Sequence, residues 1–395
     1  MNLTPEEGQR LHVLTLLEGK RISVGQAAKA LGVSPRQVRR LRVRLRREGP
    51  AALSHGNRGR PSGHRLPDPL RAQILSLARG RYAGLNDVHL TEKLTTVEGL
   101  AVSRATVQRV LRAAGHPSPR RRRPPRHRSR RPRRAQAGLL CQLDGSPFAW
   151  FGPREPPCTL LAAIDDATGA VLAATFRAQE DAAGYLELVR ALGRTVGLPA
   201  AVYTDAHGIF VRNDPHWTLA EQLQGFQEPT QVGRALQALG IHHLVAQSPQ
   251  AKGRIERLWN TFQDRLVAEL RLAGITTLAA GNAFLATTFL SGFTAQFAVP
   301  PAVAVSAYRP VPRGLDLARV CAFHYARQVA LDNTVQVEDV VLQLAPGPQR
   351  RSYARAQADV VQCLDGSWRV YVRERLVVST PAPLAPGQLR ARRRR

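Results

Sequence analysis

Three acidic residues stand where carboxylates can carry out chemistry. Asp144 and Asp205 each close a short apolar run, at residues 139–144 and 200–205, and Glu256 lies in a basic segment that opens an apolar-periodic helix. Cleavage or transfer of a phosphodiester needs charge neutralised on the attacking and leaving oxygens, which two hard cations about 3.5 to 4 Å apart achieve. Magnesium also keeps water and substrate oxygens as ligands, so three converging carboxylates suffice. The pattern predicts a site for two Mg²⁺ ions, with Mn²⁺ as the alternative.

Basic residues surround the third acid. Lys252, Arg254 and Arg257 lie on the same segment as Glu256, and such side chains usually bind phosphates in nucleic-acid complexes. A solvated charged face is the alternative. An acid at a strand end is common at turns, so one acid alone says little. The three acids together, in a strongly basic chain, favour one shared catalytic site.

The charge of the chain favours a polyanionic partner. The formal net charge is +28, and all but four of the 57 lysines and arginines are arginine. This excess favours nucleic acid over a membrane surface. The N-terminus lacks a signal-peptide pattern, no apolar run is expected to approach membrane-spanning length, and the four cysteines show no C-x-x-C spacing. We expect reduced core thiols in a cytoplasmic protein without a membrane partner.

Residues 22–45 have the pattern of a helix, a glycine turn and a second helix. Ser34 is suited to cap the second helix and Pro35 to start it. Apolar residues follow a spacing of three and four along one face. The other faces carry the arginines expected to contact DNA, namely Arg36, Arg39, Arg40 and Arg44. This pattern predicts a helix-turn-helix; a plain helical hairpin with a solvated basic face is the alternative.

A second copy of this pattern occurs at residues 86–114. Residues 102–111 resemble residues 33–41, and Arg104 and Arg109 are the candidate DNA contacts. The alternative is a set of helices that only supports the first module. The Arg- and Pro-rich residues that follow predict an extended linker, in which Arg121 and Arg122 track phosphates or form a solvated tether.

The elements that must position the acids follow the linker. We expect strands at residues 139–144, 158–165, 170–176, 200–205 and 241–246, with helices near 181–196, near 230–239 and around Glu256. The first three strands have short links and must pair antiparallel, whereas the later strands, joined through helices, return parallel. The first strand then lies beside the fourth, with Asp144 central. This is the strand order of the ribonuclease-H-like fold, and Asp165 and Asp166 are predicted to form a turn rather than a metal site.

The predicted architecture is multidomain. An all-α helix-turn-helix region precedes an α/β ribonuclease-H-like core, and alternating strands near the C-terminus predict a small β-barrel. The predicted boundaries are a helix-turn-helix domain at 1–54, a second helical DNA-binding region at 55–115, a linker at 116–137, the core at 138–298, and the β domain at 299–390 with a basic tail to 395.

Four motifs resemble a known family. They are Gln142-Leu-Asp144-Gly-Ser146, Ile164-Asp-Asp-Ala-Thr168, Tyr203-Thr-Asp205-Ala-His207 and Ser248-Pro-Gln-Ala-Lys-Gly-Arg-Ile-Glu256. Residues 138–298 resemble the integrase core of DDE transposases and retroviral integrases. Nearly the whole chain is similar to ISNCY-type insertion-sequence transposases.

The resemblance implies a function. It implies that Asp144, Asp205 and Glu256 are the catalytic, metal-binding triad, with Lys252 and Arg254 near the DNA backbone. It also implies water attack that frees element 3′-hydroxyls, their attack on target DNA, and a homodimer or larger assembly on terminal inverted repeats. Small residues after Asp205 depart from the family pattern, so His207 is assigned either a structural role or one in positioning water or contacting DNA. A nuclease without joining activity, and a transposase-derived regulator or inactive remnant, are the competing hypotheses.

Overall fold

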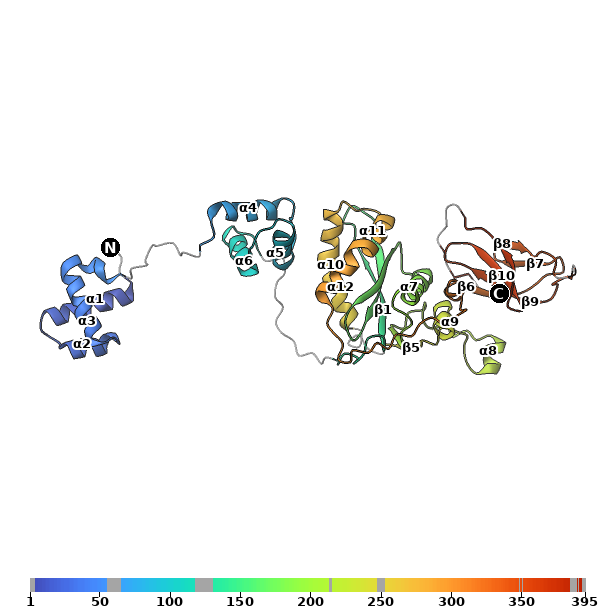
Figure 1. Cartoon of the computed structure of the whole chain (residues 1–395), viewed down its shortest axis with the longest axis horizontal. Coiled ribbons are helices and arrows are strands. Elements are labelled where there is room, and N and C mark those ends of the chain that lie inside the picture. Colours follow the sequence, from blue (N-terminus) through green and yellow to red (C-terminus); the bar gives the residue numbers. More distant parts are fainter. Residues whose placement is uncertain are drawn as a thin grey trace. The chain divides into compact units, whose positions relative to one another are not determined.

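The structure is a computed structural model. It describes residues 4–54, 65–117, 131–212, 215–246, 253–347, 349, 351–383, 389 and 391–392. The chain divides into two compact units, Met1–Gln73 and Ile74–Arg395. Figure 1 labels the helices and strands along the chain. The boundary falls within helix α4 (Asp68–Arg79).

Three helices and a short 3-10 turn build the first unit. They are α1 (Pro5–Glu18), α2 (Val24–Leu31), α3 (Pro35–Glu48) and η1 (Pro50–Leu53). Gly32 adopts a left-handed conformation with φ of 65° between α2 and α3, and Gln37 donates its backbone N–H to the side chain of Ser34. Leu14, Ala27 and Val38 are fully buried between the helices. The predicted helix, glycine turn and capped second helix are confirmed.

The second predicted helical region is also helical. It contains α4, α5 (Asp87–Thr96) and α6 (Arg104–Ala113). The Asn86 side chain accepts the backbone N–H groups of Val88 and His89 and so caps α5, while Ser103 caps α6. In both caps a side-chain oxygen accepts hydrogen bonds from backbone N–H groups of the first helical turn, which have no partner within the helix.

The core is a five-stranded mixed sheet with the order β3-β2-β1-β4-β5. Its strands are β1 (Cys141–Phe148), β2 (Cys158–Asp165), β3 (Val171–Arg177), β4 (Ala201–Thr204) and β5 (His242–Val245). The first three pair antiparallel, and β1–β4 and β4–β5 pair parallel. The pairing predicted from link lengths is therefore confirmed. Asp144 lies in the middle of β1, whose pairing with β2 runs from Cys141 to Phe148.

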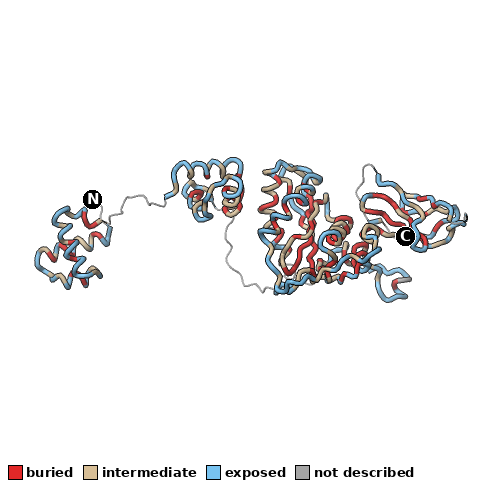
Figure 2. The backbone as a smooth tube through the Cα atoms, in the orientation of Figure 1, coloured by how far each residue is buried: buried red, intermediate tan, exposed pale blue. Residues whose placement is uncertain are grey.

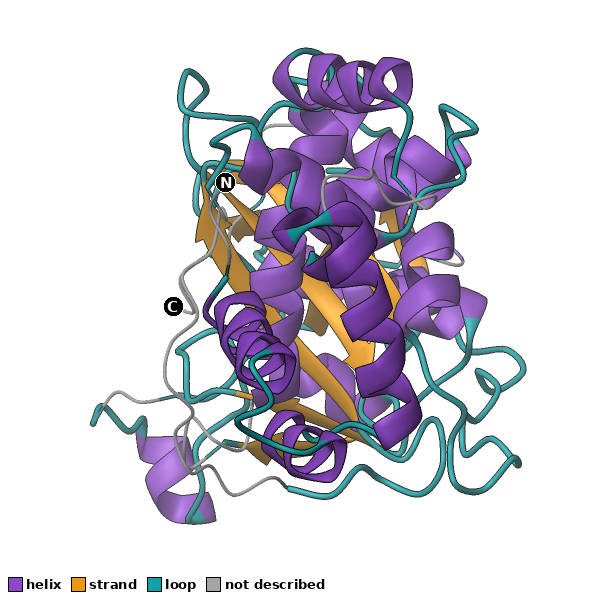
Figure 3. Ribbon diagram, turned by 90° about the vertical axis from the view of Figure 1, so that its left-hand side faces the viewer, coloured by secondary structure: helices purple, strands orange, loops and turns teal. Residues whose placement is uncertain are grey.

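Helices cover both faces of this sheet (Figure 3). They are α7 (Ala182–Thr195), α9 (Gln231–Ala238), α10 (Gly253–Leu272), α11 (Leu278–Phe284), η3 (Leu285–Phe289) and α12 (Leu290–Phe297). The short helix α8 (Leu219–Gln224) is not one of them, and its Leu219 and Leu223 are exposed. Leu161 of β2 packs in the cluster with α7 and α9, whereas its neighbours Leu160 and Ala162 pack in the cluster with α10 and α12. Because side chains alternate along a strand, β2 is buried on both faces (Figure 2).

The C-terminal part contains two separate sheets. A short helix, α13 (Leu317–Val320), precedes strands β6 (Phe323–Gln328), β7 (Thr334–Val337), β8 (Val340–Gln343), β9 (Gln357–Gln362), β10 (Trp368–Val372) and β11 (Arg375–Ser379). Four strands form a sheet in the order β11-β10-β9-β6, and β7 pairs only with β8. Among the residues that the structure describes, these strands do not close into one sheet, so the barrel stays a prediction.

One apolar stretch is longer than the sequence led us to expect. By length and composition alone, the helical stretch Leu278–Phe297, with a mean hydropathy of 1.2, could cross a bilayer. The expectation that no apolar run approaches that length was wrong. Leu285, Phe289 and Phe293 of this stretch pack in a buried cluster with α10, and Asn282 accepts the backbone N–H of Phe176 at 2.6 Å. The apolar residues thus cover the sheet.

Candidate active site

Two of the three predicted acids belong to neighbouring parallel strands: Asp144 lies in β1, and Asp205 directly follows β4. Gln142 of β1 is in register with Tyr203 of β4. Extended by two residues, this register would place Asp144 opposite Asp205, which directly follows β4. Burial raises the pKa of Tyr185, and the negative charges of Glu180, Asp144 and Asp205 raise it further.

A short turn fixes the segment after β4. The carboxylate of Asp205 accepts the backbone N–H of His207 at 3.1 Å, and Nδ1 of His207 accepts the backbone N–H of Ile209 at 3.2 Å. The hydroxyl of Thr204 donates to the Asp205 carbonyl oxygen at 2.8 Å. These bonds support the structural role of His207 that the sequence left open.

The third acid is on a helix that contacts β1 directly. Glu256 lies exposed on the first turn of α10. The backbone N–H of Ile255 donates to Gln142 Oε1 at 3.3 Å, and the indole N–H of Trp259 donates to Asp144 Oδ2 at 2.8 Å. The helix of Glu256 is thus fixed beside the strand of Asp144. Within the described ranges, no three His, Cys, Asp or Glu side chains gather as a metal-binding group.

The sequence prediction did not include Trp259. Trp259 is 7% exposed and packs in the aromatic cluster between α10 and the sheet, with its ring centroid 6.4 Å from that of Trp150. The sequence did contain a signal for this residue. Trp259 follows Glu256 by three residues, which places both side chains on one side of a helix. Apolar periodicity explained the tryptophan equally well as a core residue.

Asp165 forms the predicted turn. Its carboxylate accepts the backbone N–H of Thr168 at 2.8 Å, and Gly169 has a φ of 74°. Tyr308 and the backbone N–H of Gly138 donate to its other oxygen. Asp165 therefore holds the β2–β3 turn to the start of β1.

Asp166 does more than form a turn. It is fully buried and accepts hydrogen bonds from Arg254 at 2.9 Å, Gln142 at 2.7 Å and the backbone N–H of Arg134 at 3.0 Å; Arg131 also binds it. Burial alone would raise its pKa, but the hydrogen bonds and the positive charges of Arg131 and Arg254 lower it. The structure gives Arg254 a carboxylate partner instead of an open position for phosphate.

The other predicted DNA contacts divide into three groups. Arg36, Arg39, Arg40 and Arg44 are exposed on α3, as are Arg104 and Arg109 on α6 and Arg257 on α10. Arg121, Arg122 and Lys252 lie outside the described residues. Two arginines that the prediction left aside, Arg42 and Arg46, both bind Glu18 of α1, and their hydrogen bonds, led by that of Arg46, lower the pKa of Glu18 to about 2.

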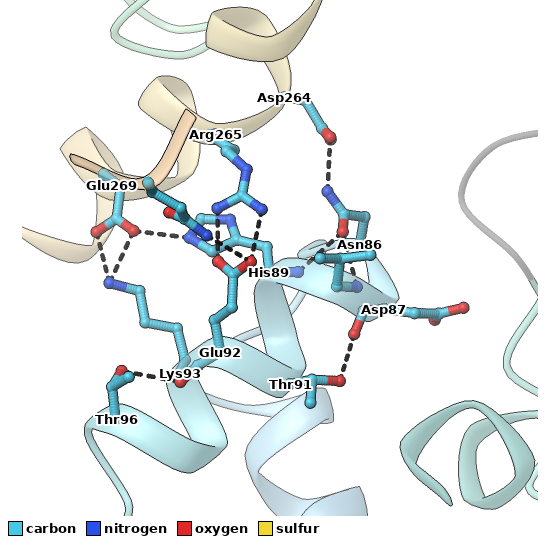
Figure 4. A network of polar contacts seen from close by, with 12 residues as sticks. Asn86, Asp87, His89, Thr91, Glu92, Lys93, Thr96, Asp264, Arg265 and Glu269 are labelled. Carbon is cyan, nitrogen blue, oxygen red and sulfur yellow. Dashed lines mark hydrogen bonds and ion pairs between the residues drawn. The ribbon is translucent and has the colours of Figure 1, made fainter. Parts of the chain in front are cut away.

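The distal half of α10 binds the second helical region (Figure 4). Arg265 donates to both oxygens of Glu92 at 2.6 and 2.9 Å. Glu269 lies 2.7 Å from both His89 Nε2 and Lys93 Nζ. Asn86, the cap of α5, also donates to Asp264 at 2.6 Å. One helix therefore contacts the strand of Asp144 near its start and α5 near its end.

A comparison with known protein families identifies the N-terminal module. Residues 10–72 match the family described as winged helix-turn helix. The exposed arginines of α3 thus lie on the second helix of a recognised helix-turn-helix module. The mixed α/β core with its acids at β1, β4 and α10 follows that module in the chain.

Relatives of the whole chain define the family. The chain is 32% identical over 351 residues to the transposase for insertion sequence IS1202 of Streptococcus pneumoniae, covering 80% of this chain and 74% of the relative. It is 40% identical over 311 residues to y4bF of Sinorhizobium fredii, also named as a transposase, covering 79% of this chain and 66% of that one, just under two thirds. The chain belongs to the insertion-sequence transposases.

A solved structure shows only a weak likeness. The simian T-cell lymphotropic virus intasome in complex with a PP2A regulatory subunit aligns over 78% of this chain and 100% of that one, at 13% identity. The TM-score is 0.26, which is too low to support an argument about the fold.

Proposed function

We propose that the protein is a DDE transposase that cuts DNA at the ends of its element and joins those ends to target DNA. The observation that carries this proposal is the parallel pairing of β1, which contains Asp144, with β4, which Asp205 follows, together with the hydrogen bond from the helix of Glu256 to Asp144. The names of the relatives support the same activity. The sheet order supports a ribonuclease-H-like core, and we retain the C-terminal barrel and the domain boundaries given above as part of the proposal.

The residues fit a pair of hard divalent cations in their chemistry. Asp144, Asp205 and Glu256 offer only carboxylate oxygens, the ligands that Mg²⁺ and Mn²⁺ prefer. When bound, such ions neutralise charge on the attacking and leaving oxygens of a phosphodiester. The family relationship and the donor set support this assignment.

The reaction has two balanced transfers at phosphorus. Water attacks the phosphodiester at the element end: its oxygen bonds to phosphorus, the bond to the 3′-oxygen breaks, and that oxygen leaves as a 3′-hydroxyl. The 3′-hydroxyl then attacks a target phosphodiester and releases a target 3′-hydroxyl. Each step exchanges one P–O bond for another, so joining needs no external energy source.

The proposed partner is double-stranded DNA. The winged helix-turn-helix at 10–72 and the exposed arginines of α3 support binding of terminal inverted repeats. Two element ends must be held together, so we propose a homodimer or larger assembly on DNA. We place the protein with the nucleoid in the bacterial cytoplasm, without a membrane partner.

The test uses purified full-length protein and DNA from both sides of the gene, in which paired inverted repeats are first sought. Asp144→Asn, Asp205→Asn and Glu256→Gln should each reduce Mg²⁺-dependent cleavage at least about 10³-fold because each removes a ligand charge needed at the reacting phosphate. Binding to the repeats should stay within about twofold. Glu187→Gln, which alters an exposed acid on α7, serves as the control.

Three outcomes separate the competing functions. Undiminished cleavage by Asp144→Asn contradicts the assignment of the triad. Repeat-specific binding by wild-type protein without any cleavage supports the regulator or remnant. Cleavage without joining, when ends with preformed 3′-hydroxyls are supplied, supports a nuclease.

A further inference from the structure

The first half of α10 and strand β1 are joined at two points. Gln142 Oε1 accepts the backbone N–H of Ile255 at 3.3 Å, and Asp144 Oδ2 accepts the indole N–H of Trp259 at 2.8 Å. Residues 142 and 144 are two apart on a strand and share one face. Residues 255 and 259 are four apart on a helix and also share one face. The two bonds therefore connect one face of the strand to one face of the helix.

The spacing of the two bonds matches on both elements. Two residues of a strand advance by about 6.6 Å, and four residues of a helix advance by about 6 Å. Since Gln142 pairs with Ile255 and Asp144 with Trp259, the strand and helix run in the same direction past each other. A shift of α10 by one residue along its axis would break both bonds. The pair of bonds thus fixes the axial position of the helix against β1.

Glu256 lies between these two points. It follows Ile255 directly and precedes Trp259 by three residues. Fixing α10 at both points therefore fixes the level of Glu256 relative to Asp144. Gln142 is itself held, because its Nε2 donates to the buried Asp166 at 2.7 Å.

We infer that Trp259 is a positioning residue of the active site: its indole N–H orients the Asp144 carboxylate and sets the helix of Glu256 at the level of that carboxylate. The bond engages a single carboxylate oxygen, so it restricts rotation of the group about its terminal torsion. Hydrogen bonds of this kind orient metal ligands, and losing one lowers metal affinity by about 10- to 100-fold. Trp259 is 7% exposed, so water competes poorly for the bond. This inference rests on the proposed function.

The chain offers a matched control in the same aromatic cluster. Trp150 is fully buried, and its indole N–H donates to the Ser146 carbonyl oxygen at 2.9 Å. Trp150→Phe and Trp259→Phe each remove one indole N–H and one fused ring. Only Trp259→Phe removes a hydrogen bond to Asp144.

The experiment measures Mn²⁺ binding to the full chain by electron paramagnetic resonance of the free ion, without DNA and without turnover. We expect Trp259→Phe to weaken binding about tenfold, and Trp150→Phe to leave it within about twofold. Benzothienylalanine at position 259 keeps the indole shape with sulfur in place of the N–H, and should weaken binding as Trp259→Phe does. Asp144→Asn should abolish the same binding. Thermal unfolding checks that each variant is folded.

The outcomes separate this inference from the proposed function. The role of Trp259 is overturned if Trp259→Phe or the benzothienylalanine protein binds Mn²⁺ with wild-type affinity while Asp144→Asn has lost this binding. The proposed metal-binding triad is unaffected by that result. Equal weakening by Trp150→Phe assigns the effect to packing and also overturns it. Unchanged Mn²⁺ binding by Asp144→Asn overturns the metal site of the proposed function, and the role of Trp259 with it.

Discussion

Asp166 is a buried carboxylate with several charged and polar donors. Arg254, Gln142 and the backbone N–H of Arg134 donate to it, and Arg131 binds it as well. These contacts join the β2–β3 turn to β1, to the residues before β1 and to the first turn of α10. A charge buried in this way is stabilised only while its partners remain. Its removal leaves the guanidinium of Arg254, 15% exposed, without its carboxylate partner.

We predict that Asp166→Asn lowers the free energy of unfolding by about 3 kcal/mol at pH 7, because one partner of a buried ion pair is lost while the other stays. Urea denaturation followed by tryptophan fluorescence measures the change. Glu187→Gln removes an exposed acid 3.8 Å from Arg177 and should cost less than about 1 kcal/mol. A loss for Asp166→Asn as small as that of the control would contradict the prediction.

The same ion pair should make stability depend on pH. The folded-state pKa of Asp166 is lowered, so its contribution is fully present above its unfolded pKa, about 3.9, and is lost as the pH falls through the folded value. The stability difference between wild type and Asp166→Asn should therefore shrink only below about pH 4. A difference that already shrinks between pH 7 and 5 would point to another group.

The sequence predicted the strands next to the acids better than the contacts that the acids and their neighbours make. Asp144 and Asp205 could be placed because apolar runs mark strands, and short or helical links determine how those strands pair. Arg254 and Asp166 are 88 residues apart, and no local pattern indicates that they meet. The bond between Trp259 and Asp144 spans 115 residues and was missed for the same reason.

Helix α10 links two parts of the second unit. Its first turns bind β1, and its last turns bind α5 through Arg265 and Glu269. Glu92 has a lowered pKa, since the hydrogen bond and charge of Arg265 outweigh the effect of burial. The two helices thus meet through paired charges, as Figure 4 shows.

We predict that reversing one charge of this contact loosens α5 and that reversing both restores it in part. Arg265→Glu places a second carboxylate beside Glu92, and Glu92→Arg places a second guanidinium beside Arg265. Each single variant should increase amide hydrogen exchange of α5 about tenfold, and the double variant should recover part of the protection, for a coupling of about 1 to 2 kcal/mol. Mass spectrometry of deuterated peptides measures this exchange.

The control for the charge swap is Glu187→Arg, on α7, which should leave exchange in α5 unchanged. Additive effects of the two reversals would show that Glu92 and Arg265 do not act as a pair. Full protection in Arg265→Glu alone would show that the contact does not hold α5.

Elements with a strong local pattern were predicted more reliably than their assembly. Ser34 marks a helix start by its capping chemistry, and this cap is present. The closure of the C-terminal strands depends on long-range pairing, and the described strands instead form two sheets. The stretch Leu278–Phe297 was underestimated because three of its polar residues, Asn282, Thr287 and Thr288, interrupt the apolar sequence.

The whole chain carries a formal charge of +28, so DNA binding should depend steeply on salt. A large basic excess also binds DNA of any sequence, and a single arginine then contributes little to the total. The position of a charge matters when it lies on the surface that faces the duplex. Helix α3 of the first unit carries two sets of arginines. Arg39 and Arg40 are exposed, and the half-buried Arg42 and the exposed Arg46 both bind Glu18.

We predict that the double variant Arg39→Ala/Arg40→Ala weakens binding to the terminal repeat and reduces the slope of log affinity against log salt by about 2, because each phosphate contact contributes about 0.9. Fluorescence anisotropy over a salt series measures both quantities. The double variant Arg42→Ala/Arg46→Ala removes the same charge from the same helix but should leave the slope within about 0.5, since those guanidiniums already bind Glu18. Circular dichroism checks that both variants keep their helices. Equal reductions of the slope would show that net charge alone governs binding, and an unchanged slope in Arg39→Ala/Arg40→Ala would show that α3 does not face the phosphates.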